Sequence, residues 1–151
     1  MTHKLPEPML RAFAEAEAAG KSGEVPVGAV VADKLGNILA SAGNRTLTDH
    51  DPTAHAEMLV IRQVAAKLGS ERLIDCDLYV TLEPCAMCAG AISHARIRRV
   101  YFADSDEKIG AMENGPRFFA QPTCHHKQGV LGRIGRDAHP TSIRGIFTSI
   151  G

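Results

Sequence analysis

Two short segments carrying histidine, cysteine and carboxylate side chains each stand at the start of a predicted helix. In DPTAHAE (51–57) a polar loop leads into a helix expected over 55–68. In EPCAMC (83–88) a proline immediately precedes a helix expected over 85–95, which suits a helix start. The second segment begins 26 residues after the end of the first. The main question about the fold is therefore whether these two helix starts lie close together, and what they bind if they do.

The surrounding pattern predicts alternating helices and strands. Helices are expected over 7–19, 55–68 and 85–95, and strands over 25–33, 38–44, 77–83 and 98–104. The last two strands are joined by a helix and should therefore run parallel. We predict an α/β protein, a three-layer α/β/α sandwich around a mixed sheet of about five strands. The expected apolar face of the second helix is formed by Met58, Ile61, Val64, Ala65 and Leu68.

Length and composition indicate a single globular domain, 1–151. No apolar run approaches the roughly 18 residues of a membrane span, and the N-terminus lacks the apolar stretch of a secretory signal. We therefore expect a cytoplasmic protein without a membrane partner. Residues 1–95 carry 8 basic and 12 acidic side chains, and residues 96–151 carry 9 and 5. The positive second part suits a polyanion on one face, or simply an unevenly charged surface.

The two helix starts together offer ligands for one metal ion. Cys85 and Cys88 are three residues apart and share one helical face, where the helix N-terminus favours thiolates. With His55 they form a set of one nitrogen and two sulfurs, which suits zinc and leaves its fourth position open. Glu57 beside such a site suits a proton carrier, so the pattern indicates catalysis. A structural or vestigial zinc site, or an incidental C-x-x-C, is the alternative.

The same motifs, together with EVPVGAVV (24–31) and the run RLIDCDLYVTLEPCAMCAGAISHARIRRVYF (72–102), resemble the bacterial tRNA adenosine deaminases of the cytidine-deaminase-like superfamily. The resemblance implies that superfamily's fold and one Zn²⁺ per subunit, bound by His55, Cys85 and Cys88. It implies that Glu57 moves protons while wobble adenosine becomes inosine. The partners implied are a tRNA anticodon stem-loop and a second copy of the chain, with no DNA.

The resemblance also implies substrate-binding residues. Asn44 corresponds to an asparagine that contacts the base, and the Ala56 backbone and Pro84 would line the base pocket. Asp106 and Lys108 match positions near the nucleotides that flank the target. Residues 127–151 depart from the family, because they lack its final amphipathic helix with a pair of phenylalanines. This divergent tail leaves the zinc chemistry untouched but bears on how tRNA is held.

Two other functions fit part of this pattern. The first is a zinc deaminase acting on a free base or nucleoside such as guanine or cytosine. The second is a catalytically idle zinc protein that serves as a dimer partner or RNA-binding module, although an idle protein has no need of Glu57. A deamination assay that compares tRNA with free bases separates these functions.

Several residues outside the motifs carry expectations of their own. Glu24 either faces the pocket or lies on the surface. Phe118 and Phe119 are expected to pack in the interior, with stacking on a base as the alternative. Cys76 and Cys124 are expected to remain free thiols, because the zinc ligand set is complete without them.

Overall fold

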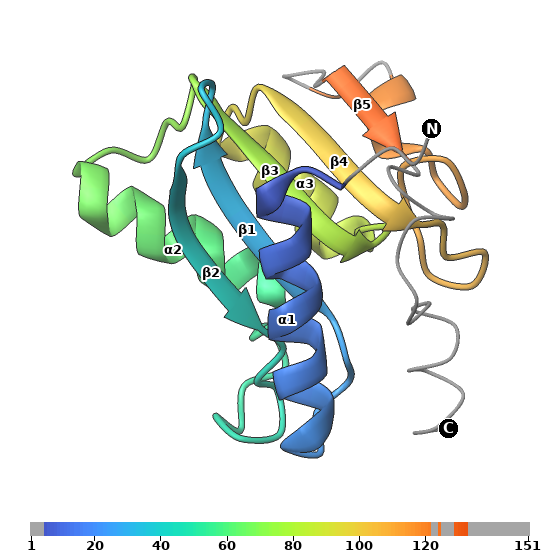
Figure 1. Cartoon of the computed structure of the whole chain (residues 1–151). Helices are drawn as coiled ribbons and strands as arrows, with labels where there is room; N and C mark the ends of the chain where they lie inside the picture. Colours follow the sequence, from blue (N-terminus) through green and yellow to red (C-terminus); the bar gives the residue numbers. More distant parts are fainter. Residues whose placement is uncertain (1–4, 122–123, 125–128, 133–151) are drawn as a thin grey trace, which may run out of the picture.

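A computed structural model describes residues 5–121, 124 and 129–132 of the chain, and its elements follow the predicted order (Figure 1). The helices are α1 (Glu7–Lys21), α2 (Ala56–Leu68), α3 (Ala86–His94) and the short 3₁₀ helix η1 (Phe118–Ala120). The strands are β1 (Gly28–Asp33), β2 (Ile38–Gly43), β3 (Cys76–Leu82), β4 (Arg99–Asp104) and β5 (Gly129–Gly132). The predicted helices and strands are confirmed, with ends that differ by up to three residues. Apart from β5, the tail expected over 127–151 lies outside the described residues.

The strands form one mixed sheet in the order β2-β1-β3-β4-β5. Strand β1 pairs antiparallel with both β2 and β3, whereas β4 pairs parallel with β3 and with β5. The predicted mixed sheet of five strands is confirmed, and so is the parallel pairing of the two strands joined by α3. Because β3 and β4 are parallel, α3 must cross back over one face of the sheet between them.

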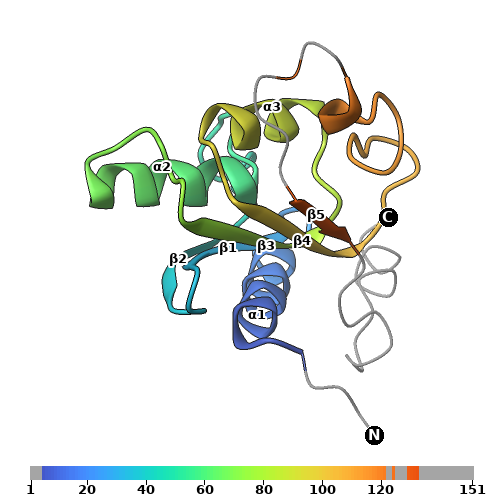
Figure 2. The same cartoon turned by 90° about the horizontal axis from the view of Figure 1, so that it is seen from above.

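Helix α1 covers one face of the sheet, and α2 and α3 cover the other, which confirms the three layers (Figure 2). Helix α1 lies close to β1 and β2 because glycines face it. A Cβ at Gly28 would lie 1.9 Å from the Ala12 carbonyl oxygen, and one at Gly43 would lie 2.7 Å from that of Glu15. At these two positions the helix backbone occupies the place of a side chain, so the close approach requires glycine.

The buried face of α2 differs from the predicted one. Its buried residues are Ala56, Glu57, Val60 and Val64. Of the expected apolar face only Val64 is fully buried, and the side chain of Leu68 is 49% exposed. The buried stripe begins with Ala56 and Glu57 because the first turn of the helix points into the molecule, toward the start of α3. Gly69 ends the helix in the left-handed conformation, with φ of 65°.

The interior between the sheet and α2 and α3 is apolar and includes Phe119. Phe118 packs against this core, and the two rings meet edge to face with centroids 5.5 Å apart, so the predicted packing of both phenylalanines is confirmed. Within the described residues, no helix is long and apolar enough to cross a membrane.

Candidate functional site

The two helix starts meet, and each presents its ligands at the first turn. His55 is the N-cap of α2, and its carbonyl oxygen accepts the N–H of Leu59 at 3.0 Å. Cys85 is the N-cap of α3, and its carbonyl oxygen accepts the N–H of Ala89 at 2.8 Å. Cys88 follows one turn later on the same face and is fully buried. Both cap residues have extended backbone, and their side chains meet.

The ligand atoms of His55, Cys85 and Cys88 lie within 4.8 Å of one another. The distances from His55 Nδ1 are 3.7 Å to the Cys85 sulfur and 3.5 Å to the Cys88 sulfur. Tetrahedral zinc with its usual bond lengths to nitrogen and sulfur would separate such atoms by about 3.6 Å. The three residues therefore fit one zinc ion and leave its fourth position open, which is typical of catalytic sites.

The two thiols share one hydrogen bond, and this sets their acidity. The hydrogen bond from Cys88 lowers the pKa of Cys85 to about 5, so Cys85 is a thiolate at neutral pH. The same hydrogen bond, together with burial, raises the pKa of Cys88. Because thiolates are the form that binds metal, an ion between the sulfurs would take the place of the shared proton.

Glu57 is the second residue of α2 and lines the same cavity, where its side chain is 4% exposed. Burial raises its pKa to about 7, and the charge of Cys85 contributes to the rise. A carboxyl group with this pKa can both accept and donate a proton near neutral pH. The structure thus places a group suited to proton transfer next to the three metal ligands.

A cavity of about 230 Å³ opens above these residues. His55, Glu57 and Cys85 are among its polar lining residues, and Val25, Val27 and Ile109 are among the apolar ones. Its volume lies below the roughly 300–1,000 Å³ of sites for drug-sized ligands, and its apolar walls with a few polar groups are typical of small-molecule sites. One flat heterocyclic base would fill such a cavity.

Two of the five substrate-binding residues expected from the sequence line this cavity, namely Asn44 and Asp106. Asn44 is buried, and its Oδ1 accepts the backbone N–H of Ala56 at 3.1 Å. Ala56 and Pro84 are buried behind the lining residues, and Lys108 is exposed outside the cavity.

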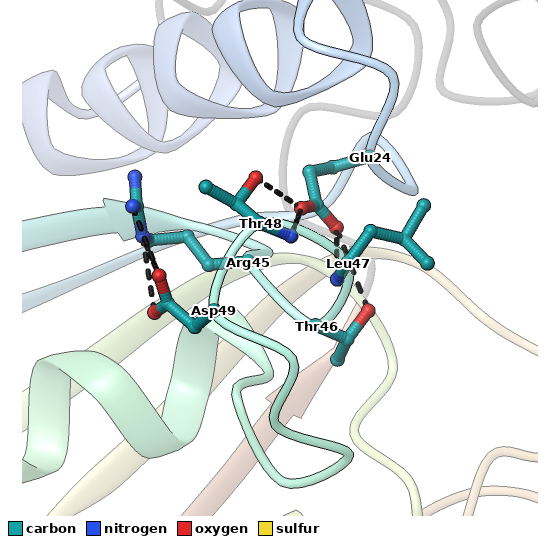
Figure 3. A network of polar contacts seen from close by, with 6 residues as sticks. All are labelled: Glu24, Arg45, Thr46, Leu47, Thr48 and Asp49. Carbon is teal, nitrogen blue, oxygen red and sulfur yellow. Dashed lines mark hydrogen bonds and ion pairs between the residues drawn. The ribbon is translucent and has the colours of Figure 1, made fainter.

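Glu24 is 2% exposed, so the surface interpretation of this residue is wrong. Its carboxylate accepts hydrogen bonds from the loop that follows β2: the backbone N–H groups of Leu47 and Thr48 and the hydroxyls of Thr46 and Thr48 (Figure 3). Burial raises the pKa of Glu24, but these bonds outweigh burial and hold the pKa below its usual range. Glu24 borders a neighbouring cavity and not the one that holds Glu57.

Sequence reasoning did not single out several residues that line the cavity. They include Val25, Val27, Thr46, Glu83 and Ile109. For Glu83 the sequence offered one signal of a place in the site, namely that it directly precedes Pro84 and Cys85. As predicted, neither Cys76 nor Cys124 forms a disulfide, and the Cys124 sulfur lies 3.6 Å from the Ser93 hydroxyl.

Comparisons with known proteins match this geometry. The family of the cytidine and deoxycytidylate deaminase zinc-binding region matches residues 3–104. The chain is 52% identical to the tRNA-specific adenosine deaminase of Agrobacterium fabrum over 90% of this chain and 89% of that protein. It is 46% identical to the tRNA-specific adenosine deaminase of Haemophilus influenzae over 85% of this chain and 75% of that protein.

Comparison with solved structures supports the same family. A structure from biochemical and structural studies of A-to-I editing by tRNA:A34 deaminases has 50% identity and a TM-score of 0.86, and covers 92% of this chain and 97% of that one. Guanine deaminase from Bacillus subtilis has 41% identity and a TM-score of 0.62, and covers 65% of this chain and 62% of that one. The chain belongs to the tRNA-specific adenosine deaminases, within the zinc-binding family of cytidine and deoxycytidylate deaminases.

Proposed function

We propose that this protein hydrolyses adenosine to inosine at the wobble position of a tRNA anticodon. The observation that carries the proposal is a buried carboxyl group, Glu57, beside a His-Cys-Cys metal site in a chain 52% identical to a tRNA-specific adenosine deaminase. An anticodon loop suits a small cavity of this kind, because its bases can leave the stack at low cost.

The chain's own residues account for the proton movements of this reaction. When bound, a zinc ion supplies a Lewis acid that makes a water molecule nucleophilic near neutral pH. Glu57 takes a proton from the attacking water and delivers it to N1 of the adenine as oxygen adds to C6. Glu57 then carries the second proton of that water to the departing amino group, so adenosine and water become inosine and ammonia. A pKa of about 7 lets Glu57 serve in both directions.

The remaining site residues would hold the substrate. Asn44 Oδ1 is occupied by the Ala56 N–H, and this bond orients the Asn44 amide so that its NH₂ group can donate to the base. Pro84 is buried and precedes Cys85 in the chain, where it would support the wall against which the base packs. Asp106 lines the cavity and Lys108 lies exposed two residues along, where each would reach nucleotides that flank the target.

We further propose that residues 1–151 act as one deaminase domain in which 127–151 is a divergent tail, and that two copies form a homodimer. We also propose that the enzyme acts in the cytoplasm, because its proposed substrate is a tRNA. Light scattering on the purified protein at several concentrations tests the dimer. A mass that stays at that of one chain would contradict it.

The test of the reaction is inosine formation and ammonia release from an anticodon stem-loop with adenosine at the wobble position. The zinc-loaded full chain is compared with Glu57→Gln, and with Glu71→Gln as a matched control at an exposed glutamate. We expect product from the first and third proteins and none from the second. No inosine from zinc-loaded wild-type protein would contradict the proposal.

A second candidate is deamination of a free base. Because the chain is 41% identical to a guanine deaminase of known structure, free guanine should be tested as a substrate, together with cytosine and adenosine. Turnover of free guanine that exceeds turnover of the stem-loop would replace the leading proposal with this one.

A further inference from the structure

Glu83 is a second buried carboxyl group at the cavity, and the reaction proposed above does not use it. It directly follows β3, lines the cavity and is 2% exposed. A buried carboxylate is costly unless donors surround its oxygens. Its partners therefore indicate what this residue does.

Within the described part of the chain, the hydrogen bonds that the Glu83 carboxylate accepts come from one irregular segment, the loop 106–114. Four backbone N–H groups and one side-chain amide donate at 2.6–3.1 Å; they belong to Asp106, Met112, Glu113 and Asn114. Oε2 accepts three of these bonds and Oε1 accepts two. Neither oxygen is left to exchange a proton with substrate, so Glu83 is poorly placed to act as a second proton carrier.

The loop also packs directly onto this carboxylate. A Cβ on Gly110 would lie 2.5 Å from Glu83 Oε2 and 2.4 Å from the carbonyl oxygen of Asp106. Gly110 also pairs with Cys85 in an isolated antiparallel bridge, and the N–H of Ala111 donates to the Pro84 carbonyl oxygen at 2.9 Å. The loop thus closes around Glu83 and is tied to the segment that carries a metal ligand.

We propose that Glu83 is a positioning residue that holds the loop 106–114 in the form that binds RNA. Two residues of this loop, Asp106 and Ile109, line the cavity, and the loop contains no helix or strand that could fix them there. With Glu83 in place, one wall of the cavity is set before RNA arrives. The inference rests on the proposed function, because it assigns this wall to the RNA that flanks the target adenosine.

The test compares Glu83→Gln with wild type, both zinc-loaded, on the wobble-adenosine stem-loop. The amide keeps the size of the side chain but turns an NH₂ group toward backbone donors. We expect KM to rise about tenfold or more, equivalent to at least about 1.4 kcal/mol, while kcat changes less than about threefold. Amide hydrogen exchange over 106–114 should quicken. Glu83→Asp retains the charge at shorter reach and should partly restore KM.

Two variants away from Glu83 itself test the same contact. Asn114→Ala removes one of the five hydrogen bonds, and Gly110→Ala forces a methyl group into the carboxylate. Both should raise KM and quicken exchange over the loop, even if Glu83→Gln fails to fold. Glu71→Gln makes the same charge change at an exposed residue, whose side chain is 86% exposed, and should alter neither quantity.

Two results would overturn the inference. One is unchanged KM and unchanged loop exchange in Asn114→Ala and Gly110→Ala. The other is a fall in kcat with KM unchanged in Glu83→Gln, which would make Glu83 part of the chemistry. Hydrogen exchange needs no substrate, so the anchoring of the loop is measured even if the stem-loop is not deaminated.

Discussion

Replacing Glu24 with glutamine should destabilise the protein, because it removes the carboxylate around which the loop after β2 is built. Both Glu24 oxygens accept two hydrogen bonds each, at 2.5–3.5 Å, from Thr46, Leu47 and Thr48. Thr46 also lines the substrate cavity. The perturbation therefore acts on a wall of the cavity as well as on stability.

The magnitude follows from the donors. Whichever way the new amide turns, its NH₂ group faces the backbone N–H of Thr48 or of Leu47, and one of these donors loses its acceptor. An unsatisfied buried donor costs about 1–3 kcal/mol. Because this loop is only partly buried, we expect the unfolding free energy to fall by about 1 kcal/mol, the lower end of that range. In a chain of this size that lowers Tm by roughly 2–4 °C.

The assay is thermal unfolding of the zinc-loaded protein, with Glu17→Gln as a control at an exposed glutamate of α1. The pKa of Glu24 lies below its ordinary 4.5 in the folded protein, so its contribution is complete above that pH and is lost as pH falls through the folded value. The gap between wild type and variant should be constant from pH 6 to 8 and should narrow below pH 4.5. A Tm within 1 °C of wild type at pH 7, or a gap that widens in acid, would refute this reasoning.

Three further predictions concern the interior and the metal. Gly28→Ala should lower the free energy of unfolding by about 1–3 kcal/mol or more in urea, because the new methyl group would meet the backbone of α1. As a control, Gly90→Ala in α3 should be neutral or slightly stabilising, because the nearest atom to its new Cβ lies 3.9 Å away. Phe102→Ala, at a fully buried position in β4, should cost about 3–5 kcal/mol in the same assay; a loss under 1 kcal/mol would contradict its place in the core. A strong chelator should release one zinc per chain and lower Tm, and Cys88→Ala should purify with little zinc; unchanged zinc content in that variant would remove Cys88 from the ligand set.

The sequence predicted the fold well because its strands are short runs of apolar residues bounded by turns. The parallel pairing of β3 and β4 followed from the helix between them, and the meeting of the two helix starts followed from the ligand chemistry. The buried face of α2 was predicted only in part: Val64 is buried and Ile61 and Ala65 pack against the core, as expected. The helical periodicity located its apolar residues but did not show that the polar Glu57 is buried and that Leu68 is exposed. The first turn of the helix is buried because it carries residues of the candidate site.

The resemblance assigned Asp106 and Lys108 to the substrate, but the conformation of the loop 106–114 lay beyond sequence reasoning for a different reason. It contains no periodic pattern, and its conformation depends on a carboxylate more than twenty residues earlier in the chain. Gly110 and Asn114 are ordinary turn residues in the sequence. They acquire a specific meaning only when Glu83 is seen between them.

The three buried glutamates show why residue type and burial alone do not single out the proposed proton carrier, Glu57. Glu24, Glu57 and Glu83 are all 2–4% exposed, and burial by itself raises the pKa of each. Around Glu24 and Glu83, backbone and side-chain donors outweigh burial and hold the pKa below its usual range, so both stay ionised and anchor loops. Around Glu57 the hydrogen bonds are too weak to offset burial, and its pKa rises to about 7. The number of donors that face each carboxylate therefore separates the group that can exchange protons from the two that shape the cavity.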